Sequence, residues 1–136
     1  MIKKILLTFI ISVFWALPLF AEQVDLIDKA EDFCIGKAVS NSDMLKCTDA
    51  ARDDWGKEMN KYYNLLMKKL TATQKNELIR TQKAWLVFRD DNAIFINSSI
   101  KNMQGTMYLN VASGEIRELV KQRAVQLRNY YKILSE

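Results

Sequence analysis

The sequence predicts an all-α protein, a small bundle of about four helices. After Pro18 the chain contains no further proline, which suits long helices because proline breaks a helix interior. Apolar residues recur at spacings of three and four, the period of one helix face, and show little of the alternation that strands display. Glycine, a second helix-weakening residue, occurs only 4 times in 136 residues.

Residues 1–21 read as a cleaved secretory signal peptide. Lys3 and Lys4 form a positive start, an apolar run follows from Ile5 to Leu19, and the small residue Ala21 offers a cleavage site. The alternative is an uncleaved anchor, but the run is short against the roughly 20 apolar residues of a membrane span. We therefore expect residues 22–136 to form one helical domain in the periplasm, or secreted, without a stable membrane anchor.

The expected helices run from about Asp25 to Cys34, from behind Ser42 to about Leu70, from Thr71 to about Ile96, and from about Thr106 to Leu134. Ser42 is a suitable N-cap with Asp43 in the first turn. Thr71 and Gln74 have capping-box spacing, and the tight turn before them predicts that the second and third helices form an antiparallel hairpin. Gly36 and Gly105 mark breaks.

The two cysteines predict one disulfide, Cys34 with Cys47, because an exported chain meets an oxidising compartment. This bridge closes a loop of about 14 residues, which is worth on the order of 3 kcal/mol in the chain-entropy model. The rival interpretation is a redox-active thiol pair. The spacing is not that of a C-x-x-C motif, and neither cysteine has a histidine or a helix start that would activate the sulfur.

Two arginines fall within apolar helix faces, Arg89 in the third helix and Arg123 in the fourth, with Gln82 and Trp85 on the same face as Arg89. A buried guanidinium must be paired or stacked, since an unpaired buried charge is costly. The candidate carboxylate partners are Asp90, Asp54 and Glu58, and Trp85 can stack on Arg89. One interpretation is an internal ion-pair network that fixes helix register; the other is a binding site.

The composition argues against catalysis. The chain has no histidine, the commonest general base and metal ligand, and no phosphate-binding or calcium-loop motif, so we expect no enzyme activity, metal or cofactor. The acidic pairs Asp53-Asp54 and Asp90-Asp91 point about 100° apart on a helix, which does not form a converging acid and base. The 20 basic residues exceed the 16 acidic ones by four, and two lysines leave with the signal, so the sequence does not predict nucleic-acid binding.

The third helix resembles the exported LprI-like lysozyme-inhibitor family. The run that carries the resemblance is Leu70-Thr71-x-x-Gln74-Lys75-x-x-Leu78-x-x-x-Gln82-Lys83-Ala84-Trp85-Leu86-x-x-Arg89-Asp90. The cysteine pair, the stretch from Met59 to Leu66, and Gln122-Arg123 with Leu127 extend it over about residues 34–130. A second cysteine pair that many members carry is absent here, at positions near Ala93 and Glu115.

The resemblance implies a non-catalytic protein whose partner is a lysozyme, and it makes Gln82, Trp85, Arg89, Asp90 and Arg123 structural or binding residues. Lysozymes that attack bacteria are usually basic, so a weakly basic inhibitor would bind through short-range contacts. The alternative is an adaptor or immunity-type protein that binds another exported protein through its tyrosines. A candidate recognition loop is the Gly105 connection, residues 97–110; the alternative is an ordinary turn.

Overall fold

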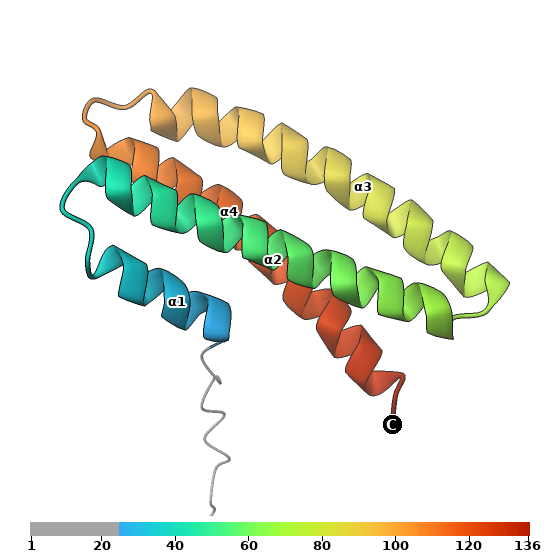
Figure 1. Ribbon diagram of the computed structural model, residues 1–136. Coiled ribbons are helices and arrows are strands. Elements are labelled where there is room, and N and C mark those ends of the chain that lie inside the picture. The colour runs from blue at the N-terminus through green and yellow to red at the C-terminus, as the bar shows by residue number, and fades with distance from the viewer. Residues whose placement is uncertain (1–24) are drawn as a thin grey trace, which may run out of the picture.

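The structure, a computed structural model, describes residues 25–136 and contains four α-helices, one short and three long (Figure 1). They are α1 (Leu26–Ile35), α2 (Asn41–Lys69), α3 (Ala72–Ile96) and α4 (Met107–Ile133), and a short π-helical turn, η1 (Asn97–Lys101), extends α3. The predicted all-α class and the antiparallel arrangement of α2 and α3 are confirmed. The predicted signal peptide, residues 1–21, lies outside the described residues.

The helix ends follow their capping residues. Asp25 caps α1 by accepting from the Ile27 amide, and Thr71 and Gln74 form the predicted capping box at the start of α3. The predicted N-cap of α2 was wrong: Ser40, not Ser42, accepts from the Asp43 amide. Both serines are plausible caps by residue type, and the one three residues before Asp43 forms the bond to the N3 amide.

Helices α2 and α4 run parallel and form the centre of the molecule. Three hydrogen bonds join them along their length: Asn41 Nδ2 donates to Thr106, Ser113 Oγ to Asp49, and Lys69 Nζ to Ser135. The residues in these pairs are 65, 64 and 66 positions apart. The sequence separation between paired residues is nearly constant, which requires the two helices to advance in the same direction. Helices α2 and α4 are therefore in register from one end to the other.

The hydrophobic core lies mainly between α2 and α4. Its largest fully buried side chains are Trp55, Leu66 and Leu127. The complete buried cluster is Trp55, Met59, Leu66, Leu78, Val120, Ala124 and Leu127. Helix α3 contributes Leu78 to this cluster, and its partly buried Trp85 packs against it. Helix α3 therefore covers a core that the other two long helices build.

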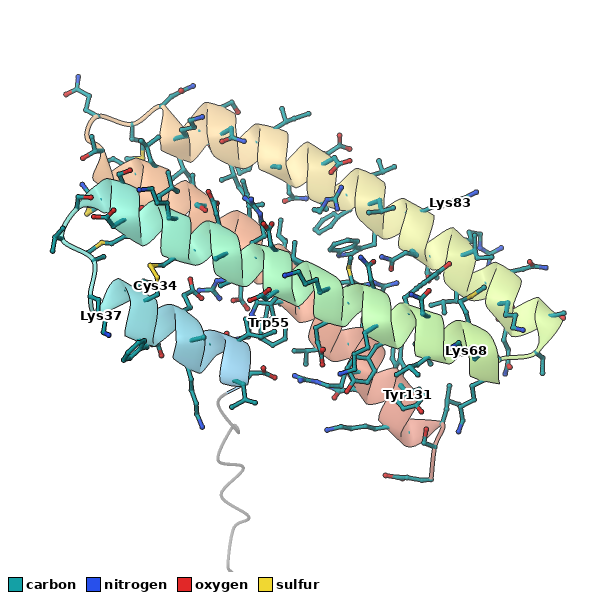
Figure 2. All side chains as sticks on the ribbon, viewed as in Figure 1. Cys34, Lys37, Trp55, Lys68, Lys83 and Tyr131 are labelled. Atoms are coloured by element: carbon teal, nitrogen blue, oxygen red, sulfur yellow. A yellow bond between two sulfur atoms is a disulfide. The ribbon has the colours of Figure 1, made fainter. Side chains whose placement is uncertain are left out.

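The predicted disulfide between Cys34 and Cys47 is confirmed. It joins the last turn of α1 to α2, with 5.7 Å between the two Cα atoms. Cys34, labelled in Figure 2, is exposed at the end of α1, whereas Cys47 of α2 is buried, so the bridge attaches the end of a short helix to the side of a long one. The ten residues of α1 are too few for an isolated helix to be stable in water, which makes this attachment important.

A ladder of ion pairs holds the rest of α1 against α4. Asp25 binds Arg128 at 2.6 Å, Asp28 binds Lys121 at 2.7 Å, and Glu31 lies 3.3 Å from Arg117. The carboxylates are three residues apart and therefore share one face of α1. As their residue numbers rise, the numbers of their partners in α4 fall, so the two helices are antiparallel. None of these ion pairs was predicted from the sequence.

Burial affects the two ends of the ladder differently. Burial would raise the pKa of Asp25, but the hydrogen bonds from Arg128 and from the Ile27 amide outweigh it and lower that pKa below 3.8. For Glu31, burial outweighs the attraction of Arg117 and the Thr48 hydrogen bond and raises the pKa above 4.5. The two carboxyl groups therefore have opposite effects on stability as the pH changes.

Asp25→Asn and Glu31→Gln should give melting temperatures with opposite pH dependences. Ionised Asp25 stabilises the fold above its unfolded pKa, and this stabilisation is lost as the pH falls through its lowered folded pKa. An asparagine side chain can still cap the helix, so Asp25→Asn should melt lower than wild type at about pH 7 and approach wild type toward about pH 3.

Neutral Glu31 favours the fold, and that advantage is lost as the pH rises through its raised folded pKa. Glu31→Gln should have the melting temperature of wild type at low pH and a higher one at neutral pH. If the difference in melting temperature between variant and wild type changes with pH in the same direction for both variants, this account is contradicted.

Candidate functional site

A polar cleft lies between α2, α3 and α4 and has a volume of about 690 Å³. Its lining residues are Arg52, Asp53, Gly56, Lys57, Met59, Asn60, Arg89, Asp90, Ala93, Ile116 and Val120. A Cβ atom added to Gly56 would meet no heavy atom within 4 Å, so the cleft is open beside this glycine. Two residues of the family motif, Arg89 and Asp90, form part of its α3 wall.

The cleft brings together one residue from each of the two acidic pairs singled out in the sequence, Asp53 on the α2 wall and Asp90 on the α3 wall. Both side chains are well exposed, and both are near arginines: Arg52 lies 3.8 Å from Asp53, and Arg89 lies 2.6 Å from Asp90. A glycosidase needs one carboxyl group kept protonated in a shielded site. Asp53 and Asp90 are exposed and lie beside guanidinium groups, so neither carboxyl group is shielded in this way.

Arg123 is buried beneath the cleft, between α3 and α4, with 7% of its surface exposed. Its Nε donates to Gln82 Oε1 at 2.9 Å and its Nη1 donates to Gln126 Oε1, while Nη2 has no hydrogen-bond partner in the described protein. Gln82 in turn donates to Met59 Sδ at 3.6 Å. The motif residues Gln82 and Arg123 thus connect α3 to α4 and, through Met59, to α2.

The expected ion-pair network around Arg123 was wrong. Its hydrogen-bond acceptors are neutral amides, and burial lowers its pKa. Two of the predicted carboxylate partners bind other cations: Asp54 pairs with Lys57, and Glu58 pairs with Lys61 and lies near Arg128. Neutral amides satisfy guanidinium hydrogens without supplying a counter-charge, so Arg123 fixes the position of α3 at some cost in stability.

Arg89 was correctly expected to stack and pair. Its guanidinium lies 5.5 Å from the centre of the Trp85 ring, and its Nε and Nη2 both donate to Asp90 Oδ1. About a third of its side chain remains exposed. The family motif therefore divides into an inner pair, Gln82 and Arg123, that joins helices, and an outer pair, Arg89 and Asp90, that is accessible from the cleft.

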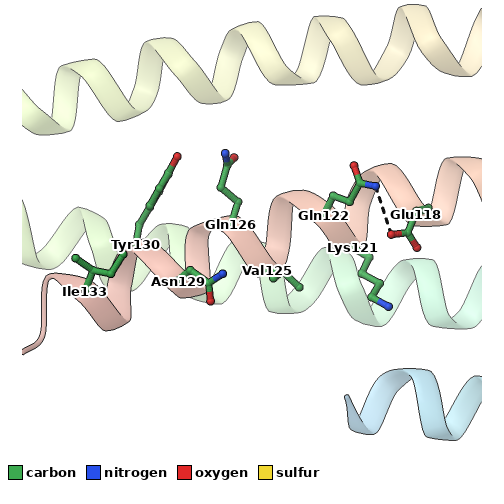
Figure 3. A pocket seen from close by; sticks show the side chains of 8 residues that line it. All are labelled: Glu118, Lys121, Gln122, Val125, Gln126, Asn129, Tyr130 and Ile133. Atoms are coloured by element: carbon green, nitrogen blue, oxygen red, sulfur yellow. Dashed lines mark hydrogen bonds between the residues drawn. The ribbon is translucent and has the colours of Figure 1, made fainter. Parts of the chain in front are cut away.

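A second groove, of about 400 Å³, runs along α4, which supplies all of its lining residues (Figure 3). Gln122, Gln126 and Tyr130 point from α4 toward α3, and Lys121 and Val125 point away from it. Gln122 donates to Glu118 at 3.4 Å, and Gln126 is the residue that binds Arg123. This groove therefore touches the inner motif pair only through Gln126.

The predicted recognition loop consists mostly of ordered turns. Residues 97–101 form η1, and Gly105, with φ +111°, supplies a left-handed residue that only glycine adopts readily. Asn41, at the start of α2, donates a hydrogen bond to the Thr106 hydroxyl at the end of this connection. A role for this connection in recognition stays a prediction.

Across residues 25–136 there is no group of three or more His, Cys, Asp or Glu side chains placed to hold a metal ion. In the same range, no helix has the length and apolar character that crossing a membrane requires.

Substitutions at the two motif arginines should affect stability to different extents. Arg123→Ala removes a buried hydrogen-bonded side chain and leaves Gln82 Oε1 without its donor, so we expect a loss of more than about 2 kcal/mol in the free energy of unfolding. Arg89→Ala removes a partly exposed pair and should cost less than about 1 kcal/mol. Arg123→Met keeps most of the volume without the buried charge and should recover much of the loss. Urea denaturation measures all three, and equal losses for the two alanine variants would contradict the division of the motif.

Comparisons with known proteins give one family match and a solved structure with a similar fold. A family model described as "Lysozyme inhibitor LprI" matches residues 34–127. The crystal structure of an uncharacterized protein from Burkholderia thailandensis has a similar fold, with a TM-score of 0.76 and 28% sequence identity. That match covers 82% of this chain but 56% of the other, so this chain spans little more than half of that relative. No curated protein matches the chain. Because the family model covers both cysteines and every motif residue, the chain belongs to the LprI lysozyme-inhibitor family.

Proposed function

We propose that this protein is an exported, non-catalytic inhibitor that binds a lysozyme and thereby protects peptidoglycan. The observation that carries the proposal is the family match over residues 34–127, the part of the chain that contains every motif residue and all residues that line the cleft. In this proposal residues 1–21 direct export to the periplasm and are removed, so the protein is placed where lysozyme attacks.

The rigidity of the described domain supports a binding role. The disulfide, the capping box and the α1–α4 ion pairs fix the helices at several separate points. A surface held on fixed helices loses little conformational entropy when a partner binds. The exposed, ion-paired cleft residues fit contact with a protein better than they fit bond cleavage.

The adaptor alternative, with tyrosines as the contact, has less support. Tyr62, Tyr63 and Tyr131 are partly buried and pack against the core, and the rings of Tyr62 and Tyr131 lie 5.8 Å apart. Tyr130, the fourth tyrosine of the proposed contact, is exposed, at 45%. Most of this group therefore stabilises the bundle and is not free to anchor a partner.

A cell-wall lysis assay tests the proposal. Purified residues 22–136 are titrated into a c-type lysozyme acting on a suspension of bacterial cell walls, and the fall in turbidity is followed. We expect lysis to slow in proportion to added protein until one binding site per lysozyme is filled. The same protein added to cells lysed by detergent is the control, because it reveals any effect on turbidity that does not involve lysozyme.

Undiminished lysis at a large molar excess, repeated with a lysozyme of a different structural class, would exclude the inhibitor function. Slowing of both the lysozyme and the detergent reactions would show protection of the cells and not inhibition of the enzyme. Inhibition that saturates at a fixed ratio supports the proposal.

A further inference from the structure

Helix α3 has a second apolar face, directed away from the core. Val87, Phe88, Ile94 and Phe95 are 62%, 52%, 68% and 64% exposed. Successive residues turn by about 100° around a helix, which places these four within one sector of about 120°. The residues that α3 buries or partly buries, such as Leu78, Trp85 and Ile96, lie on the opposite side. The packing of the bundle therefore does not account for the outer residues.

Asp91 lies in the middle of this outer sector, flanked by the four apolar side chains. Its carboxylate is exposed and takes part in no ion pair within residues 25–136. Between Lys83 and Lys101, the one basic residue in the intervening sequence is Arg89, which is turned inward onto Trp85 and Asp90. The outer α3 patch, defined as Val87, Phe88, Asp91, Ile94 and Phe95, is thus apolar and locally acidic, on a domain whose total charge is weakly basic.

We propose that the outer α3 patch is the surface that contacts lysozyme, with Asp91 receiving a cationic side chain of the enzyme. This inference rests on the proposed function and adds the contact surface to it. Apolar side chains around a charged contact exclude water, which strengthens the attraction between the two charges. A basic lysozyme supplies the complementary charge, so a local acidic patch replaces the favourable net charge that the whole domain lacks.

A second copy of this chain fits the patch less well. Two copies related by a twofold axis at the patch would use the same residues on both sides. Such a contact would bring two Asp91 carboxylates together at its centre, and the repulsion between like charges disfavours it.

Four single substitutions in the purified domain test the patch. Asp91→Lys reverses the central charge, and Glu77→Lys is its control: it makes the same charge change on the same side of α3, but 14 residues, or about 21 Å, away. Phe95→Ser removes an aromatic ring from the patch, and Phe33→Ser removes an equally exposed one (66%) from α1. Binding to a c-type lysozyme is measured by calorimetry at low and high salt, and melting temperatures establish that each variant is folded.

We expect the wild type to bind, and Asp91→Lys and Phe95→Ser each to weaken Kd at least tenfold, while both controls stay within twofold of wild type. The salt dependence of Kd should decrease in Asp91→Lys. Wild-type binding with equal affinities for patch and control variants would overturn the patch and leave the proposed function intact. A wild type that binds no lysozyme would remove the proposed function and this inference with it. Sedimentation that finds a wild-type dimer, dissociated by either patch substitution, would assign the patch to self-association and overturn the inference.

Discussion

The burial of Trp55 is the constraint on which most of the architecture depends. Its ring is fully buried on α2, and its indole N–H, which can only donate, finds an acceptor in Asp28 of α1 at 3.3 Å. Lys121 and Arg128 of α4 lie 5.6 and 5.7 Å from the ring centre, and both also bind carboxylates of α1. One indole therefore joins three helices, and the short α1 is stable because it completes the polar surroundings of this ring.

With α1 on one side of the α2–α4 pair, α3 covers the other side and is attached differently. The connection from Lys69 to Ala72 fixes one end of α3, and the Gln82–Arg123 pair fixes its middle. These long polar side chains hold two helices farther apart than small apolar residues would, and Gly56 adds no side chain to fill the remaining space. The cleft is therefore a consequence of joining α3 through polar groups. Among residues 25–136, no helix covers the outer side of α3.

Local patterns predicted the features that depend on neighbouring residues in the chain. The period of apolar residues predicted the helix class, Thr71 and Gln74 predicted the start of α3, and the expectation of export predicted that the two cysteines form a bridge. By contrast, the hydrogen-bonded ion pairs of Asp28 and Asp25 with α4 join residues 93 and 103 positions apart, and Arg123 lies 41 positions from Gln82. Such pairings depend on which faces meet in space. Residue spacing along one helix carries no information about them, which is why the carboxylate partners predicted for Arg123 were wrong.

Net charge was similarly a poor guide to how this domain could recognise a basic partner. A total charge is a sum over the whole surface, whereas a contact responds to charges within about a Debye length, roughly 8 Å at physiological ionic strength. Most acidic residues of α1 and α2 are already paired with nearby lysines and arginines, so they contribute little to the field outside the protein. Asp91 has no such partner within the described chain and is exposed among apolar side chains that are also exposed. A weakly basic domain can therefore present an acidic contact to a basic enzyme without any change in its overall charge.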